Sequence, residues 1–403
     1  MLQRLRAHDL PWFLIIITLA LTAAGVASVF SACYDSASPL GLGHEARQQI
    51  LWWMVGAVAC AIVMRIPIAG LQAAAIPVYA TCLIIQVLMI ALAGTPLVPS
   101  IKGLHNWIRL GPLGNLQPSE LLKLGTLMGL ARLCATPDFD VRRLSHILGA
   151  LAVAGLPALV LAKSFDLGSA LTFPPMAFGM LFAAGMRLHH AALLVVAGAA
   201  IVVGGVQLLP HDGPKAYQYQ RIQAFLHPDD YRMGEGYQTS HSIDAIGSGQ
   251  VFGKGYLAGD LTRIKYVPEN HTDMIFSVVG EETGFVGAIV VLALFLAFII
   301  ALAVAATPLR GQFARGLIAG FTALIMGETA INLAVAMGLC PVTGITLPFF
   351  SYGGSSLLGC YLGVGLAAAA AVSERQRVTV TIRKRSSATT ASGWEESPAR
   401  RRT

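Results

Sequence analysis

The segment 266–285 holds the residues with the clearest chemical potential, at the point where a long polar stretch meets an apolar one. It contains the titratable residues His271, Asp273, Glu281 and Glu282. Ionisable groups beside an apolar span are costly and therefore indicate function. A partly buried carboxylate can accept a proton from a hydroxyl group and so activate it as a nucleophile. The simpler interpretation is that Asn270, Thr272 or Asp273 only caps the following helix.

Two further charged groups accompany predicted helix ends. Glu120 and Lys123 lie three residues apart in a predicted helix, so they share a face and can form an ion pair, which could be purely structural. Asp166 follows Lys163 in a very short connector. There it either caps the next helix or faces a cavity.

The segment 346–356 breaks the helical pattern with Pro348 and Gly353-Gly354, and it contains Ser351. Irregular backbone at membrane depth is tolerated only where it is buried in protein or lines a cavity. Arg47, Arg109 and Lys123 could hold a diphosphate, although Arg47 could also be an interfacial anchor. All these groups fall on the same predicted side of the membrane as Asp273, which favours one outward-facing polar cavity.

The composition of the chain indicates that membrane-spanning helices position these polar side chains. The chain has 403 residues, of which 55% are hydrophobic and 12% charged, against about 25% charged in soluble domains. Apolar stretches near 20 residues predict an all-α polytopic membrane protein, whereas a β-barrel would show short alternating segments. The net charge of +7 lies in short connectors and the tail, which indicates membrane topology and not nucleic-acid binding.

The apolar pattern predicts about ten transmembrane helices with both termini in the cytoplasm. The expected spans are 11–31, 49–66, 71–93, 117–135, 145–162, 167–185, 190–209, 284–306, 316–338 and 347–371. This arrangement puts the Arg142-Arg143 connector inside and a large loop, 210–272, outside between spans seven and eight. We expect a membrane domain over 1–375 and a basic tail, 376–403, that is disordered from about Ser386. The cysteines are expected to be small core residues, although Cys33 and Cys340 could pair.

Six motifs in fixed order over about residues 10–372 closely resemble the SEDS family, the RodA, FtsW and SpoVE proteins of bacterial cell-wall synthesis. They are Trp107-Ile-Arg-Leu-Gly-Pro112, Gln117-Pro-Ser-Glu120, Asp166-Leu-Gly168, Ile246-Gly-Ser-Gly249, His271-Thr-Asp273 with Gly280-Glu-Glu282, and Leu347-Pro348 with Ser351-Tyr-Gly-Gly-Ser355. The loop motifs look closer to RodA than to FtsW, although a FtsW-type division role stays open. Ser164-Phe165 replaces the Gln-Pro that the family usually has before Asp166, and Thr283 stands where Leu is common.

The resemblance implies a ten-span peptidoglycan glycosyltransferase of the bacterial inner membrane that polymerises lipid II. Asp273 would be the general base, and the stereochemistry would invert. Arg47, Arg109, Lys123 and Lys163 would stabilise the lipid diphosphate, Glu120 would position Lys123, and Ser351 would shape the cavity floor. The other substrate-binding candidates are Asp166, His271 and Glu281.

The expected partners are lipid II, the nascent glycan, membrane lipid, a class B penicillin-binding protein and other elongation or division proteins. Mg²⁺ or Mn²⁺ could bridge the diphosphate, although the sequence has no evident metal motif. Two alternatives to a glycosyltransferase stay open. The first is a lipid II transporter, which intramembrane charge pairs and broken helices suit equally well. The second is a non-catalytic scaffold for the transpeptidase.

Overall fold

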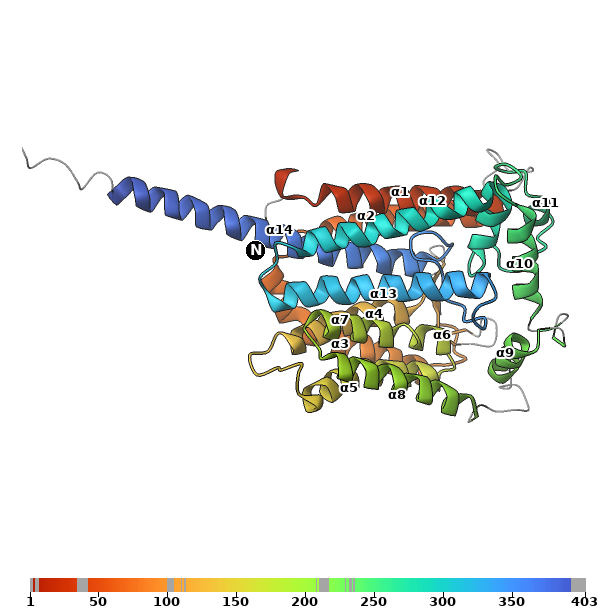
Figure 1. The fold of residues 1–403 in the computed structure, drawn as a ribbon, viewed down its shortest axis with the longest axis horizontal. Helices are drawn as coiled ribbons and strands as arrows, with labels where there is room; N and C mark the ends of the chain where they lie inside the picture. Colours follow the sequence, from red (N-terminus) through yellow and green to blue (C-terminus); the bar gives the residue numbers. More distant parts are fainter. Residues whose placement is uncertain are drawn as a thin grey trace, which may run out of the picture.

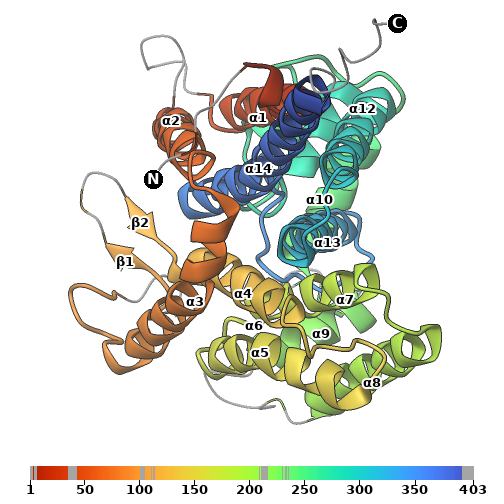
Figure 2. The ribbon, with the colours of Figure 1, turned by 90° about the vertical axis from the view of Figure 1, so that its left-hand side faces the viewer.

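The computed structural model describes residues 3, 7–34, 43–99, 105–109, 111, 114–207, 209, 217–228, 230–231, 234 and 236–392, with side chains up to 376. Most of the helices lie side by side in one elongated bundle (Figures 1 and 2). The first half contains η1 (Ala7–Asp9), α1 (Trp12–Ala32), α2 (His44–Val63), α3 (Ile68–Ala91), β1 (Ile108–Arg109), β2 (Asn115–Leu116), α4 (Pro118–Cys134), α5 (Leu144–Lys163), α6 (Leu167–Ala170), α7 (Phe173–Ala183) and α8 (Leu188–Gln207). The second half contains α9 (Tyr217–Leu226), α10 (Tyr237–Ser248), α11 (Asp260–Arg263), α12 (Ile275–Ala306), α13 (Gln312–Ala336) and α14 (Gly354–Ser392). The two short strands pair antiparallel.

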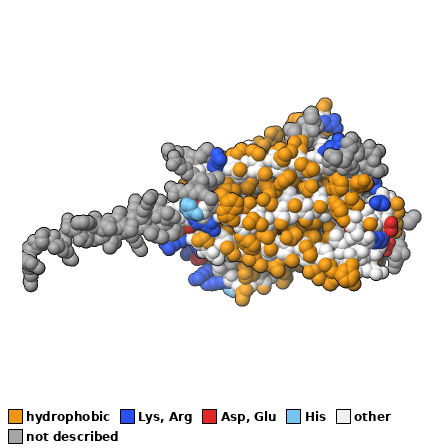
Figure 3. All heavy atoms as spheres, turned by 90° about the horizontal axis from the view of Figure 1, so that it is seen from above, with side chains coloured by type: hydrophobic (Ala, Val, Ile, Leu, Met, Phe, Trp, Pro, Cys, Tyr) orange, Lys and Arg blue, Asp and Glu red, His pale blue; other side chains and the backbone are white. Residues whose placement is uncertain are grey.

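Ten helical segments correspond to the ten expected spans, which confirms the all-α membrane fold. Among the described residues, eight helices are long and apolar enough to cross a membrane: α1, α2, α3, α5, α8, α12, α13 and α14. The other two segments are α4, with 17 residues, and α6–α7, which is interrupted at 171–172. Hydrophobic side chains cover the middle of the surface in Figure 3, and charged side chains gather at its two ends. This distribution is the one that a lipid environment selects.

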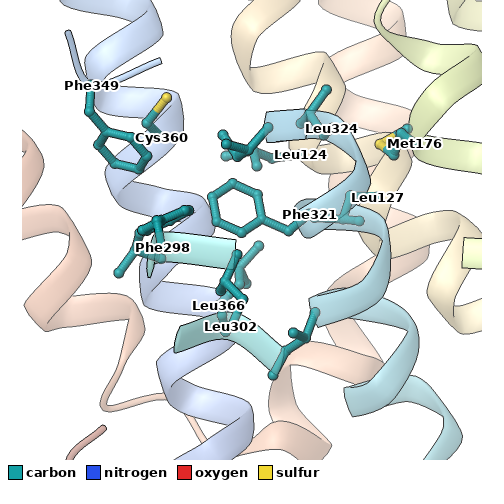
Figure 4. Close-up of a cluster of buried hydrophobic side chains, with 14 of the residues drawn as sticks. Leu124, Leu127, Met176, Phe298, Leu302, Phe321, Leu324, Phe349, Cys360 and Leu366 are labelled. Atoms are coloured by element: carbon teal, nitrogen blue, oxygen red, sulfur yellow. The ribbon is translucent and has the colours of Figure 1, made fainter. Parts of the chain in front are cut away.

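The core forms where α14 runs through the bundle against α2 and α13. Alanines 367–371 of α14 are all buried, and small residues let helix backbones approach closely in membranes. Phe298 of α12 packs edge-to-face on Phe321 of α13 at 6.4 Å between ring centroids, and 5.0 Å from Phe349 (Figure 4). These aromatic contacts fix the segment before α14 against the bundle.

Gly284 interrupts α12 at the residue where the eighth span was expected to begin. Its backbone has φ 61° and ψ −160°, a conformation open essentially to glycine alone. The segment 249–255 packs into this kink, because Lys254 N donates to the Glu281 carbonyl oxygen at 3.0 Å and Phe285 N donates to the Gln250 carbonyl oxygen at 2.9 Å. The glycines of the segment 249–255 therefore allow its backbone to pack closely against the backbone of α12 at the kink.

The loop 210–272 is partly helical, with α9, α10 and α11 gathered at one end of the bundle (Figure 1). The α4–α5 connector, with Arg142-Arg143, and the C-terminal part of α14 lie at the opposite end (Figure 1). This separation agrees with the expected topology, whose absolute orientation stays a prediction.

The basic tail differs from expectation, because α14 continues as a helix to Ser392. Many residues of this extension, such as Val378, Thr379 and Thr381, have only modest helix propensity, so it continues a helix that is already nucleated in the core. Residues 393–403, and Arg4 and Arg6 near the other terminus, lie outside the described residues. Cys33 and Cys340 carry free thiols.

Candidate active site

A polar cavity of about 1100 Å³ opens at the end of the bundle that carries α9. Its walls come from α2, the β1–β2 hairpin, the start of α4, the α5–α6 connector, α9, the turn before α12, and the segment between α13 and α14. Five of the predicted site residues line it: Arg109, Glu120, Lys123, Asp166 and Asp273. Chain segments more than 200 residues apart thus meet at one site, as the single-cavity hypothesis requires.

Asp273 lies in the turn before α12 and lines the cavity half-buried. The helix begins at Ile275, and its N-cap residue, Met274, makes no side-chain cap hydrogen bond. The N-cap position thus falls on Met274 and not on Asn270, Thr272 or Asp273, which were expected there. A Cβ atom at Gly344 would lie 3.7 Å from Asp273 Oδ2, an ordinary van der Waals distance, so the carboxylate lies beside the α13–α14 segment.

The α13–α14 segment holds the turn that contains Asp273. Tyr352 N donates to the carbonyl oxygen of His271 at 2.8 Å, and Asn332 Nδ2 donates to the carbonyl oxygens of Asp273 and Ile345, both at 2.8 Å. Asn332 is buried on α13. These bonds fix the backbone on both sides of the carboxylate, while its side chain faces the cavity.

Lys123 lies at the base of the cavity between two carboxylates. Its Nζ atom is 2.7 Å from Glu120 Oε2 and 2.5 Å from Glu328 Oε1, and all three side chains are at most 12% exposed. The predicted pair of Glu120 with Lys123 is present. Glu328 was not among the predicted site residues, although an acidic residue inside an apolar span is itself a signal of function. A phosphate would have to compete with two carboxylates for Lys123.

Asp166 was expected either to cap a helix or to face a cavity, and it does both, since it caps α6 and lines the cavity. Its Oδ1 atom accepts from Ser169 N at 3.1 Å, and its Oδ2 atom accepts from Gln117 Nε2 at 3.2 Å. Burial raises the pKa of the Asp166 carboxyl, while the bonds from Ser169 act in the opposite direction. The structural bonds of Asp166 are therefore sufficient to explain its position.

The other predicted site residues lie outside the cavity lining: Arg47, Lys163, His271, Glu281 and Ser351. Arg47 is exposed on α2 between His44 and Gln48, which do line the cavity. Lys163 is exposed at the end of α5. Both long side chains stand next to the site without forming its walls.

His271 and Ser351 support the cavity from behind. The His271 ring lies 5.6 Å from that of Tyr352, a lining residue. Ser351 Oγ accepts from Leu347 N at 2.9 Å, and its carbonyl oxygen accepts from Gln49 Nε2 at 3.0 Å. Ser351 thus orders the segment before α14, one layer behind the cavity surface.

Glu281 is fully buried outside the cavity lining, where it binds residues of the loop 210–272 and not the space in which a substrate was expected to contact it. Its carboxylate accepts from Leu261 N, Thr262 N and Lys254 Nζ, each at 2.8 Å, and from Thr262 Oγ1 at 2.7 Å. The bond to Glu281 raises the pKa of Lys254. A carboxylate with four donors is a strong anchor for the loop that ends at Asp273.

Two charged lining residues, Arg221 on α9 and Glu269, were also missed by the sequence analysis. Both belong to the long outer loop, where sequence position alone does not show which side chains turn inward. Among the described residues, no three His, Cys, Asp or Glu side chains converge to hold a metal ion. The described residues thus supply a candidate base in Asp273 and cationic groups for an anionic substrate.

Comparison with known proteins gives consistent matches over nearly the whole chain. The family described as "Cell cycle protein", that of FtsW, RodA and SpoVE, matches residues 11–376. A protein of Trichlorobacter lovleyi named "Probable peptidoglycan glycosyltransferase FtsW" is 36% identical over 372 residues, 90% of this chain and 93% of the relative. A relative with the same name from Geobacter metallireducens is 33% identical over 374 residues, 91% and 95% of the two chains.

Solved structures that resemble this chain come from the same group of proteins. A chain of a peptidoglycan synthase complex, described as coordinating polymerization and crosslinking, aligns with TM-score 0.73 and 30% identity over 91% of this chain and 98% of that one. The rod shape determining protein RodA of Thermus thermophilus aligns with TM-score 0.65 and 26% identity over 91% and 97%. The fold and the motif order thus agree with the same group of proteins.

Proposed function

Because the chain belongs to the family of FtsW, RodA and SpoVE cell cycle proteins, we propose that it polymerises lipid II into the β-1,4 glycan of peptidoglycan, with Asp273 as general base. The chain is a multi-pass membrane protein and a peptidoglycan glycosyltransferase. The observation that carries the proposed mechanism is that Asp273 lines the same cavity as Arg109 and Arg221.

In the proposed reaction, Asp273 accepts the proton of the acceptor sugar hydroxyl. The hydroxyl oxygen then attacks the anomeric carbon of the diphosphate-linked chain, and the bond from that carbon to the diphosphate oxygen breaks. Attack from the face opposite the diphosphate inverts the stereochemistry. Cationic side chains such as Arg109 would stabilise the diphosphate as it leaves.

Lys123 has a supporting part in this proposal. Its ion pairs with Glu120 and Glu328 join α4 to α13, and thereby fix the cavity base. Mg²⁺ or Mn²⁺ stays a prediction, and its ligands would have to include oxygens of the diphosphate itself. We assign four of the other predicted substrate-binding residues, Arg47, Lys163, His271 and Ser351, to the surroundings of the cavity.

A division role of the FtsW type is better supported than the RodA-type role that the loop motifs favoured, because the curated relatives reported above are named FtsW. We also propose the bacterial inner membrane as location and a class B penicillin-binding protein as partner. The latter is supported by the likeness to a chain of a synthase complex.

The test is polymerisation of purified lipid II by the purified protein with its transpeptidase partner. Asp273→Asn should fold and bind the partner but lose roughly 10²–10⁴-fold in rate, because an amide cannot accept the proton. The matched control is Asp244→Asn, an exposed carboxylate on α10 outside the cavity lining, which should polymerise normally. Near wild-type glycan synthesis by Asp273→Asn would remove the catalytic assignment. A wild-type protein that makes no glycan but moves lipid II between leaflets would favour the alternative function of a lipid II transporter.

A further inference from the structure

Four aromatic residues line the described part of the cavity: Trp52, Trp107, Phe165 and Tyr352. Trp52 is buried in the core of the bundle, and the Tyr352 hydroxyl donates to Gln48 Oε1 at 2.6 Å. Phe165 is half-buried in the connector between α5 and α6. An aromatic ring in the wall of a polar cavity offers a flat apolar surface to a bound substrate.

Phe165 has an unusual backbone conformation. Its φ angle is 61°, in the left-handed region, where a bulky side chain is unfavourable. Glycine would fit this conformation without strain. Proline, which the family usually has at this position, cannot adopt it, because the proline ring fixes φ at about −65°. A strained phenylalanine in the wall of the proposed active site therefore indicates that its side chain has a function.

The connector that carries Phe165 adjoins the wall that carries Asp273. Helix α6 follows the connector and packs against the α13–α14 segment, since a Cβ atom at Gly168 would clash with the carbonyl oxygen of Thr343. The next residue, Gly344, lies beside the Asp273 carboxylate. Phe165 and Asp273 therefore belong to neighbouring walls of one cavity.

Hydrogen-bonding side chains surround Phe165. Gln218 of α9, which lies at the same end of the bundle as α6 (Figure 1), lines the cavity and donates from Nε2 to the Phe165 carbonyl oxygen at 3.3 Å. Gln117 and Asp166 line it as well. Amide and carboxylate groups can bind hydroxyl groups, whereas an isoprenoid chain offers them no partner. A sugar fits this combination, because it has C–H groups on the face of its ring and hydroxyl groups around the edge.

We propose that the Phe165 ring stacks on the face of a sugar of lipid II and thereby holds that sugar next to Asp273. The inference rests on the proposed function and names a residue that determines specificity for the sugar. Stacking fixes the plane of the sugar ring, which limits the directions in which its hydroxyl groups can point. Phe165 thus binds and orients the substrate and takes no part in the proton transfer.

The test measures binding of lipid II to the full chain in detergent, with Asp273→Asn present in every variant to prevent turnover. Phe165→Gly and Phe165→Ala should each raise the dissociation constant roughly 5- to 20-fold, whereas Phe165→Tyr should bind normally. Farnesyl diphosphate has no sugar, so its dissociation constant should stay unchanged in all of them. The matched control is Phe225→Ala, an exposed phenylalanine of α9 outside the cavity lining, which should bind lipid II normally.

The glycine and alanine variants separate the ring from the backbone, because both remove the ring but only glycine also removes the strain. Equal losses of lipid II affinity would support stacking. Normal affinity with Phe165→Gly and weak affinity with Phe165→Ala would show that only the backbone conformation matters, and would overturn the inference. Phe165→Leu keeps the apolar bulk, so it should fold like the wild type and still bind lipid II more weakly than Phe165→Tyr.

Two further outcomes would also overturn the inference: normal lipid II binding by Phe165→Ala, and an equal loss of farnesyl diphosphate binding, which would assign the ring to the lipid tail or the diphosphate. The proposed function fails separately. If the protein with Asp273 intact makes no glycan, while lipid II binding still depends on the Phe165 ring, the proposed function is refuted and the stacking contact stands.

Discussion

The side-chain amide of Asn332 donates to the backbone carbonyl oxygen of Asp273 at 2.8 Å and, from the same nitrogen, to that of Ile345 at 2.8 Å. One buried group on α13 thus joins the turn before α12 to the segment before α14. Those two segments form the cavity wall on either side of the Asp273 carboxylate. Asn332 therefore sets where that carboxylate lies.

Replacing Asn332 by Ala or Asp should lower the kcat of lipid II polymerisation by about 10- to 100-fold, with KM changed by less than about threefold. Alanine leaves two buried carbonyl oxygens unpaired, and a charged aspartate repels them. Steady-state kinetics of the purified complex check the prediction. Gln86→Ala, which removes a buried amide from α3 outside the cavity lining, should cost stability without lowering kcat. An equal fall in kcat for both variants would mean that Asn332 acts only through general stability.

The cluster of Lys123, Glu120 and Glu328 should behave as one unit. Glu328→Ala should destabilise the protein by about 1.5–3 kcal/mol, because it removes one charge-assisted hydrogen bond of buried Lys123 and leaves the pair with Glu120 in place. Lys123→Met should be at least as damaging, since it leaves two carboxylates facing each other. Thermal unfolding in detergent measures both effects.

Double variants test the pairing itself. Lys123→Met with Glu328→Ala, and Lys123→Ala with Glu120→Ala, should each cost less than the sum of the single changes. The control is Asp140→Ala, which breaks the exposed Arg143–Asp140 pair and should cost only about 0–1 kcal/mol. Additive losses in the buried cluster would show that its members do not depend on one another.

Gly284→Ala should disrupt the kink in α12. A Cβ atom at Gly284 would lie 2.4 Å from Gly253 N, and positive φ with extended ψ disfavours any side chain by about 1–3 kcal/mol. We expect a smaller folded fraction in size-exclusion chromatography and faster proteolysis of the loop that contains 249–262. Gly149→Ala is the matched control in the interior of α5, where no atom lies within 4 Å of the new Cβ, so it should be neutral or stabilising. Normal folding of Gly284→Ala would show that the kink is dispensable.

Accessibility labelling should establish the topology. In a background without the native cysteines, Phe252→Cys should react with a membrane-impermeant maleimide in intact spheroplasts, because Phe252 is 82% exposed in the outer loop. Arg142→Cys, exposed in the α4–α5 connector, should react only after the membrane is opened. The reverse pattern would invert the predicted orientation, which rests on the arginine distribution.

Local composition and residue order were enough to predict the features that depend on neighbouring residues. Apolar length predicted the helices, because a span must cover the membrane with residues of low polarity. Spacing predicted the pair of Glu120 with Lys123, since positions three apart share a helix face. The order of the six motifs predicted the family and pointed to Asp273.

The tertiary structure decided which side chains meet, because contacts between distant segments leave no periodic signal in the sequence. It brought Glu328 to Lys123 across 205 residues and turned Arg221 into the cavity. It also showed Glu281 to be an anchor for the loop, although the motif alone did not distinguish it from a substrate ligand. The backbone of the turn puts the N-cap position of α12 at Met274, one residue after Asp273. Local sequence gives a carboxylate its chemistry, but packing determines whether its oxygens face a backbone amide or an open cavity.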